Sequence, residues 1–321
     1  MKGSSFLTGT RRTLALFTVA SVFFGGTFVA AKAGLEFFPP LLFVALRFDI
    51  AAVALLGFVA ATTPRDELRP RSFGDVVGIL ATGVFVIGLS NALLFVGQQY
   101  VSSGVGSIIF SLNPILTPVF AMVFLANERL SARGAVGMLI GLVGVALVVQ
   151  VDPSNLLGGD AAWKGVVFLG AAIGALGTVI IRWAETSISS TVRTAWALPV
   201  SAALTHSLSL ASGESMAMVA WTPSAIAALG YVGIFAGAVA YIAYFGLLDE
   251  VGPIHGNLVF YAVPIVATLG GAALLGESIS ASTFTGFVII FLGFAVLASE
   301  SILAEVEAWY DILVSTIQST N

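Results

Sequence analysis

Arg47 is the residue whose type fits its surroundings least well, because it lies within a long apolar stretch of the chain. If that stretch is a membrane helix opened by Pro40, Arg47 lies about 10 Å along it. A charged side chain at the centre of such a helix costs about 2.5–3.5 kcal/mol, so it must face a protein interior. Asp49, two positions on, falls on the wrong side of a helix to pair with it. Arg47 therefore either binds an anionic substrate group or fixes a network of helix C-terminal carbonyls.

Amide and aromatic side chains recur on two other apolar stretches at matching places. Asn91 and Phe95 share a helical face by their spacing of four. Tyr241 and Phe245 stand 150 residues later in the same relation, with Tyr244 beside them. Such a wall suits an amphipathic solute, which is the first interpretation. Hydrogen bonding between neighbouring helices, worth about 0.6 kcal/mol in membranes, is the alternative.

Two prolines interrupt matching apolar stretches, expected at 104–125 and 253–275. Pro114 and Pro264 each lie ten residues beyond positions 104 and 254, about 15 Å at helical rise, which is half of a bilayer of about 30 Å. A proline frees the carbonyl four residues earlier, and in lipid that carbonyl needs protein or a wet cavity beside it. Paired interruptions near the bilayer midplane indicate a transport site and gating elements; a packing kink is the alternative.

Polar residues precede both prolines on equivalent faces. At the 150-residue offset Ser107 matches Asn257, and Ser111 matches Tyr261, seven and three residues before the prolines. Asn113 stands directly before Pro114. These five residues join the candidate substrate-binding set with those named above.

The polar residues belong to an internal repeat. Pro114 aligns with Pro264, and after a one-residue gap the offset becomes 149. The aligned pairs at this second offset are Glu128–Glu277, Gly137–Gly286 and Gly144–Gly293. Each copy belongs to five apolar spans, and an odd number of spans inverts the second copy in the membrane. Inverted repeats are typical of secondary transporters.

The amino-acid composition indicates a membrane protein. Charged residues are 9% of the chain and apolar residues 58%, against roughly 25% charged in soluble domains. Continuous apolar runs predict helices rather than the alternating strands of a barrel. We therefore expect an all-α membrane protein of ten transmembrane helices. The expected spans are 14–34, 40–61, 74–96, 104–125, 134–150, 163–182, 192–211, 224–247, 253–275 and 282–299.

Little in the sequence suggests bond-making chemistry. Cysteine is absent, the histidines His206 and His255 are separated, and no carboxylate pair falls at mid-span. We therefore expect no catalytic residue, no metal site and no cofactor. Each histidine either carries protons or is simply hydrogen-bonded. The pI near 5.1 gives no electrostatic reason to bind nucleic acid.

Residues at the ends of spans suggest structural roles. Glu128 and Glu277 are expected to form a turn or cap ahead of the next helix, with Ser131 and Ser280 as N-caps; gating is the alternative. Closely spaced glycines such as Gly137-xxx-Gly141 allow helices to approach closely.

The stretch FGGTFVAAKAGLEFFPPLLFVALRFDIAA, residues 24–52, resembles the first two spans of the EamA-like branch of the drug/metabolite transporter superfamily. The matching residues are Phe24-Gly25, Thr27-Phe28, Lys32, Pro40, Arg47 and Ala51, although Phe24 stands where the family usually has Trp. Asn113-Pro114, followed by Glu128 and the spaced glycines, is similar to the family's second pattern. The resemblance implies two inverted five-helix repeats that move a small organic metabolite.

Together these patterns predict two repeats, 14–150 and 163–299, and a cytoplasmic amphipathic tail at 301–321. The leading hypothesis is a secondary active transporter in the cell membrane, most simply an exporter of amino acids or related compounds. Import or exchange of a sugar, nucleotide-sugar or organic-acid-like solute is the runner-up; a channel or sensor and a membrane enzyme are weaker alternatives. The expected partners are a small-molecule substrate and the bilayer, and a homodimer stays open.

Positive charge predicts the orientation. With the N-terminus in the cytoplasm, ten Lys and Arg lie inside and two, Lys32 and Lys164, outside. The inside set is Lys2, Arg11, Arg12, Arg65, Arg69, Arg71, Arg129, Arg133, Arg182 and Arg193. Both termini should therefore be cytoplasmic. A fluorescent protein fused to the C-terminus should fluoresce in bacteria, and an active periplasmic phosphatase at that position would reverse the topology.

Overall fold

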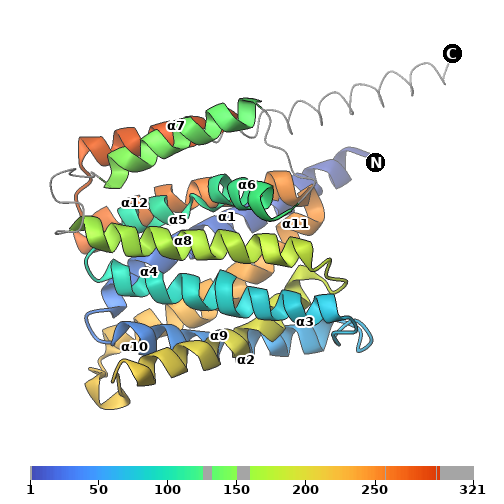
Figure 1. The fold of residues 1–321 in the computed structure, drawn as a ribbon. Coiled ribbons are helices and arrows are strands. Elements are labelled where there is room, and N and C mark those ends of the chain that lie inside the picture. The colour runs from blue at the N-terminus through green and yellow to red at the C-terminus, as the bar shows by residue number, and fades with distance from the viewer. Residues whose placement is uncertain (1, 126–131, 150–159, 257, 294, 297–321) are drawn as a thin grey trace.

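The computed structural model describes residues 2–125, 132–149, 160–256, 258–293 and 295–296, and their regular structure is entirely helical (Figure 1). No strand occurs among these residues, which confirms the all-α prediction. Six helical segments are long and apolar enough to cross a membrane by length and composition: Arg11–Gly34, Pro40–Thr62, Phe73–Gln98, Ser103–Phe124, Ala161–Trp183 and Pro223–Val251. Shorter apolar helices accompany them.

The first half contains helices in every stretch where a span was expected. They are α1 (Lys2–Gly34), α2 (Pro40–Thr62), α3 (Phe73–Leu80), the π-helix η1 (Ala81–Leu89), α4 (Ser90–Gln98), α5 (Ser103–Phe110), α6 (Asn113–Phe124) and α7 (Ala132–Val149). The elements α3, η1 and α4 form one continuous rod. A break at residues 111–112 separates α5 from α6.

The second half repeats this order, except that it adds a short turn, η2, and has the single helix α12 where the first half has α5 and α6. It contains α8 (Asp160–Trp183), α9 (Ser190–Ala211), the short 3₁₀ turn η2 (Met216–Met218), α10 (Pro223–Gly230), the π-helix η3 (Tyr231–Val239), α11 (Ala240–Gly256), α12 (Val259–Leu275) and the helix Ala281–Gly293. The expected start of the ninth span at residue 253 is wrong, because α11 continues to Gly256. The amphipathic tail at 301–321 lies outside the described residues.

Corresponding helices of the two halves run in opposite directions. Lys32, at the end of α1, donates from Nζ to the carbonyls of Gln98 and Gln99 at 2.9 Å each. Next to them the Tyr100 ring stacks on Trp163, near the start of α8, at 4.1 Å between centroids. The end of α1 and the start of α8 therefore lie at the same end of the bundle, as inverted repeats require.

The two halves interlock around α2 and α9. These two helices pack along one another, η1 packs on α9, and η3 packs on α2. The π-helices η1 and η3 are themselves offset by 150 residues, so both halves carry the same widened segment. The Ser201 hydroxyl of α9 donates to the Gly83 carbonyl of η1 at 2.8 Å, so the widened backbone is hydrogen-bonded to the neighbouring helix.

A buried carboxylate, that of Asp75, joins the halves at the end where α3 begins. It completes a capping box with Ser72 at the start of α3. The same carboxylate crosses to the other half and accepts from the backbone N–H groups of Ser187 at 2.7 Å and Ile188 at 3.2 Å. Asp75 is fully buried, so each of these hydrogen bonds offsets the cost of its desolvation.

Two further carboxylates cap helices at the opposite end. Glu214 accepts from the backbone N–H groups of Leu41 and Leu42 at the start of α2, at 3.2 and 2.7 Å. Glu277 accepts from the Ser103 N–H at the start of α5, at 2.9 Å. Glu277 therefore caps a helix of the other repeat, and its expected role ahead of its own next helix is wrong. Helix N-termini attract carboxylates through their unpaired N–H groups, wherever those lie in the sequence.

Ser280 behaves as expected, because its hydroxyl accepts from the Thr283 N–H at 3.1 Å and caps the helix Ala281–Gly293. Glu128 and Ser131 lie outside the described residues.

Glycines join α7 to the helix Ala281–Gly293, as the spaced glycines predicted. A Cβ added at Gly144 would meet the Gly286 carbonyl oxygen at 2.6 Å, and one at Gly286 would meet the Gly144 carbonyl at 2.6 Å. A Cβ at Gly293 would meet the Gly137 carbonyl at 2.6 Å. The two helix backbones thus touch where no side chain intervenes.

The Gly144→Ala substitution should therefore destabilise the protein. The new methyl group would press on backbone atoms, and overpacking of this kind costs about 1–3 kcal/mol. Gly165→Ala is the matched control, because a Cβ there meets nothing within 4 Å. Size-exclusion chromatography of detergent-solubilised protein after heating should show a lower melting temperature for the first variant alone. Equal melting temperatures would contradict the glycine contact.

Candidate substrate-binding site

Five aromatic rings from three helices meet where the two repeats face each other. The Phe24 ring of α1 lies 5.2 Å from Tyr241, 6.0 Å from Tyr244 and 6.1 Å from Phe260, between centroids. Phe245 stacks on Tyr241 at 5.9 Å. We call Phe24, Tyr241, Tyr244, Phe245 and Phe260 the aromatic cluster. It contains both tyrosines of the predicted wall.

Arg47 borders this cluster. Its guanidinium carbon lies 5.0 Å from the Phe48 ring centroid and 5.1 Å from that of Phe95, and Tyr241 is close enough to interact with it electrostatically. Phe95 comes from the predicted polar face of α4. The structure thus brings together three predicted site residues, Arg47, Phe95 and Tyr241, from α2, α4 and α11.

Two of the three guanidinium nitrogens of Arg47 have no hydrogen-bond partner among the described residues. The residue is 4% exposed, and its Nε and Nη1 atoms have no hydrogen-bond partner among the described residues. Asp49 faces the other side of α2, as predicted, where its carboxylate lies 2.8 Å from His206 Nε2. The expected network of Arg47 with helix C-terminal carbonyls does not occur within the part of the chain that the structure describes.

The energies of the contacts around Arg47 show that its hydrogen-bonding groups are left unsatisfied. Two cation–π contacts at about 0.5–2 kcal/mol each offset much of the roughly 2.5–3.5 kcal/mol that a mid-membrane arginine costs. They supply no hydrogen-bond acceptor, however, and the Nε and Nη1 atoms have none among the described residues. A buried donor without a partner costs about 1–3 kcal/mol. The arginine is therefore held in place by rings but still lacks an acceptor.

A hydrogen bond between the repeats lies beside the cluster. Pro264 cannot donate to the Phe260 carbonyl, and the Ser111 hydroxyl lies 3.2 Å from that carbonyl, sharing its one proton between it and the Ser107 carbonyl at 2.9 Å. In the first repeat Asn113 Nδ2 donates to the Phe110 carbonyl, the group that Pro114 leaves free, at 3.3 Å. Both carbonyls that the prolines leave free are thus satisfied by polar side chains of the predicted site, those of Ser111 and Asn113.

The two prolines are not equivalent, contrary to the expected symmetry. Pro114 follows the break between α5 and α6, whereas Pro264 lies inside the continuous helix α12, which begins at Val259. The expected placement of both prolines ten residues into matching helices is therefore wrong, because Pro114 is the second residue of α6 and Pro264 lies five residues beyond the start of α12.

Several predicted site residues lie apart from the cluster. Ser107 is fully buried and bonds the Gly104 carbonyl of its own helix at 2.7 Å. Asn113 faces α8, because a Cβ added at Gly174 would lie 3.5 Å from its Oδ1. Asn91 donates to the Ile87 carbonyl at 2.8 Å. The Tyr261 ring packs edge-on against Phe291 of the last helix at 5.6 Å.

Asn257 lies outside the described residues, as does the side chain of His255. His206, with Asp49, lies on the outer surface of the bundle, with side chains 39% and 48% exposed. These two groups therefore do not contact the aromatic cluster.

Each π-helix ends two residues before a residue of the predicted site. η1 ends at Leu89, two residues before Asn91, and η3 ends at Val239, two residues before Tyr241. π-Helical turns are rare and often lie at functional sites. The sequence analysis missed them, together with Phe260 and the position of Phe24 in the cluster. The only sequence signal for the π-helices was the 150-residue offset between the two halves, which also relates the two widened turns.

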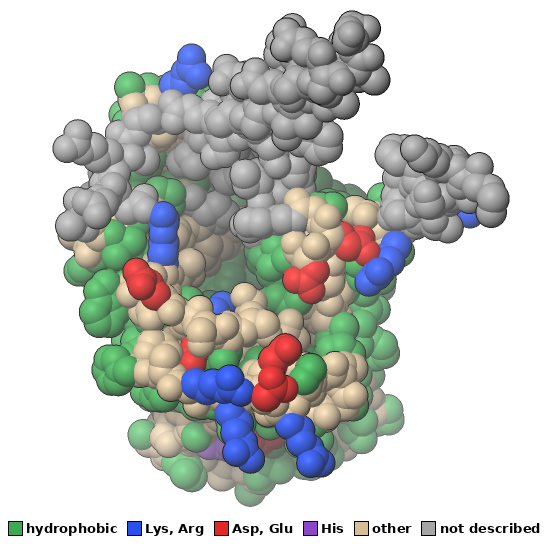
Figure 2. Space-filling model, turned by 90° about the vertical axis from the view of Figure 1, so that its right-hand side faces the viewer, with side chains coloured by type: hydrophobic (Ala, Val, Ile, Leu, Met, Phe, Trp, Pro, Cys, Tyr) green, Lys and Arg blue, Asp and Glu red, His purple; other side chains and the backbone are tan. Residues whose placement is uncertain are grey.

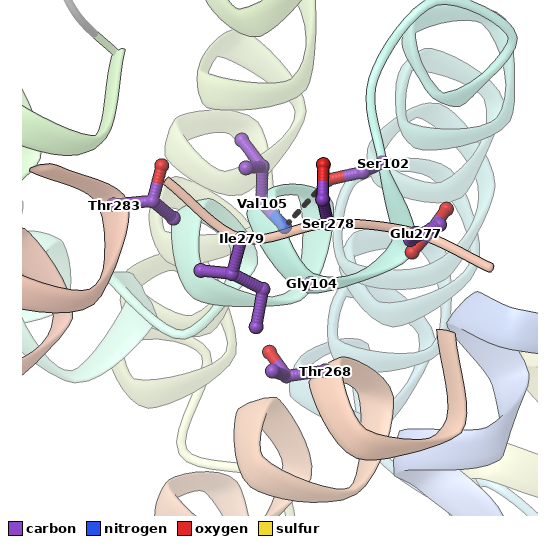
Figure 3. Close-up of a pocket in the computed structure, with 8 residues that line it drawn as sticks. All are labelled: Ser102, Gly104, Val105, Thr268, Glu277, Ser278, Ile279 and Thr283. Carbon is purple, nitrogen blue, oxygen red and sulfur yellow. Dashed lines mark hydrogen bonds between the residues drawn. The ribbon is translucent and has the colours of Figure 1, made fainter. Parts of the chain in front are cut away.

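Two other features lie at the ends of the bundle. The end at which α1 begins carries Lys, Arg, Asp and Glu side chains around a hollow whose visible walls are hydrophobic (Figure 2). At the opposite end a small pocket lies between α5, α12 and the last helix, with Glu277 at its edge (Figure 3). None of the residues that line this pocket belongs to the aromatic cluster.

A known family model matches each of the two halves separately. The model of the EamA-like transporter family matches residues 11–150 and again residues 162–299. The chain belongs to the EamA-like transporter family. The family resemblance of the first two spans and of the Asn113-Pro114 region is thereby confirmed. The fold is the two-repeat architecture of that family.

Relatives within the family are named as transporters. An uncharacterized transporter of Archaeoglobus fulgidus is 24% identical over 84% of this chain and 93% of its own length. The uncharacterized inner membrane transporter YedA of Escherichia coli is 26% identical over 81% of each chain. A solved crystal structure, 22% identical, covers 92% of this chain and 99% of its own with a TM-score of 0.60, which shows a shared fold. This EamA-like chain is therefore a multi-pass membrane transporter.

Loss of the Ser111 hydroxyl should loosen the contact between the repeats. Ser111→Ala removes the donor to a carbonyl that Pro264 cannot satisfy, so we expect a stability loss of about 1 kcal/mol. In Ser107→Ala, the matched control, the Gly104 carbonyl keeps its backbone partner within α5, so the loss should be smaller. Melting temperatures in detergent test the difference. The same loss in both variants would argue against a special role for the Phe260 carbonyl.

Proposed function

We propose that this EamA-like protein is a secondary active transporter of ten membrane-spanning helices, with both termini cytoplasmic, which exports amino acids or related small metabolites. The observation that carries the proposal is the meeting of Arg47, Phe95 and the aromatic cluster between the two repeats. Aromatic side chains beside a few oriented polar groups are typical of the lining of small-molecule sites.

Alternating access supplies the mechanism. The solute binds between the repeats, and a rearrangement of one repeat against the other opens the site to one side of the membrane at a time. The groups that join the repeats, Ser111 with the Phe260 carbonyl and the carboxylates of Asp75, Glu214 and Glu277, are the contacts that such a movement must loosen in turn.

A sugar, nucleotide-sugar or organic acid carried by import or exchange is the second candidate. Arg47 favours the organic acid within this group, because its N–H groups lack acceptors among the described residues.

Transport in liposomes tests the function. Purified protein should mediate saturable uptake of at least one amino acid or organic acid, and preloading with the unlabelled compound should stimulate uptake several-fold. Protein-free liposomes are the control. An unsaturable ionic conductance without counterflow would indicate a pore and sink the carrier proposal.

The location of the site can be tested separately, because the chain contains no cysteine. Thiol labelling of Tyr241→Cys and Tyr244→Cys, both in the aromatic cluster, should slow when the transported solute is present. Glu67→Cys, in an exposed loop, should label at the same rate with or without solute. Equal rates in all three variants would place the binding site elsewhere.

A further inference from the structure

Arg47 is a buried cation that the described part of the protein does not neutralise. The ion pairs found among described residues join Arg12 to Glu250 and His206 to Asp49, and neither includes Arg47. Asp49, the acid closest in sequence, is engaged on the outer face of α2. A charge in a low-dielectric interior requires a counter-charge or hydrogen-bond acceptors, and its Nε and Nη1 atoms have neither here.

The surroundings orient this cation instead of compensating it. The rings of Phe48 and Phe95 lie about 5 Å from its guanidinium carbon, at 5.0 and 5.1 Å. These rings supply no hydrogen-bond acceptor, so the N–H groups of the guanidinium keep their capacity to bind a ligand. A planar carboxylate matches the fork of these N–H groups best.

The rest of the site determines the chemistry of the part of the ligand that does not contact Arg47. The aromatic cluster gives the site apolar walls that suit a hydrocarbon or aromatic body. It includes no carboxylate to receive an ammonium group. The buried carboxylates of Asp75, Glu214 and Glu277 are engaged at helix ends. A zwitterionic amino acid would thus bring a cation for which these described residues hold no acidic partner.

The repeat symmetry fixes the number of charges. At the 150-residue offset Arg47 corresponds to Ala197, which is fully buried, so the second repeat supplies no matching cation there. One cation balances one negative charge. A dianion such as a phosphate monoester would leave a charge uncompensated between apolar walls.

We infer that the transported solute is an organic monocarboxylate with an apolar or aromatic body and no ammonium group, and that its carboxylate binds Arg47. This inference rests on the proposed transport function, but it replaces the first candidate substrate, an amino acid, by the organic acid of the second candidate. It favours an organic acid over an amino acid.

Four compounds with one phenyl body test the charge requirement: phenylacetate (anion), phenylacetamide (neutral), phenethylamine (cation) and phenylalanine (zwitterion). Binding to purified protein is measured by equilibrium dialysis and by the shift in melting temperature. Phenylacetate should bind at least ten-fold more tightly than each of the other three. Equal binding of phenylalanine or the amide, or no binding by any of the four, would overturn the inference.

Variants connect the preference to Arg47. Arg47→Gln should lower the affinity for phenylacetate at least ten-fold and reduce the ratio of acid to amide binding, whereas Arg47→Lys should retain part of that ratio. Arg65→Gln, which removes an exposed loop cation, should leave it unchanged. An unchanged ratio in a folded Arg47→Gln protein would reject the assignment. If Arg47→Gln does not fold, the wild-type ratios and the Lys variant still decide.

The failure of this inference is separate from failure of the transport function. Counterflow of an amino acid or a neutral solute, unaffected by Arg47→Gln, would preserve the transporter and reject the anion site. Absence of counterflow for every solute, with normal phenylacetate binding, would reject the carrier and leave the anion site standing.

Discussion

The structure depends on one constraint: inside a hydrocarbon layer no water is available to pair with a backbone N–H or C=O group. Continuous helices satisfy this constraint alone, but helix ends and prolines leave backbone groups unpaired. Each such group needs a partner from elsewhere in the chain. For two of them the partner comes from the opposite repeat: Ser111 lies beside the Phe260 carbonyl, and Glu277 caps the start of α5. The constraint thus holds the two halves together.

The same contacts relate stability to transport. Carboxylates at both ends of the bundle bind backbone groups of the other half, with Asp75 at one end and Glu214 and Glu277 at the other. These bonds are local, and each involves few atoms. A rearrangement that opens one end can break its own set while the other set persists. Rigid halves joined by separable polar contacts are well suited to a two-state carrier.

Much of this fold could be predicted from the sequence, because apolar run length and repeat spacing are strong signals. Helices occupy the expected stretches, although α1 begins at Lys2 and α12 at Val259 rather than at residues 14 and 253. Arg47 was correctly placed facing inward, away from Asp49. The partners of polar groups could not be predicted, because they depend on which segments meet in space. Glu277 caps α5 rather than its own following helix, and Asn113 faces α8 rather than the aromatic cluster. Pro264 was expected to interrupt its helix, but a hydroxyl from the other half satisfies the carbonyl that it leaves free, and α12 continues.

The two π-helices have a consequence for the history of the molecule. A widened turn occupies residues 81–89 and again residues 231–239, at one offset, in halves that now differ at most positions. An extra residue in a helix disturbs its packing, so its independent arrival twice at the same place is the less economical account. One gene encoding a single repeat, later duplicated and fused, explains both. That ancestor would have inserted into its membrane in both directions and assembled as an antiparallel pair.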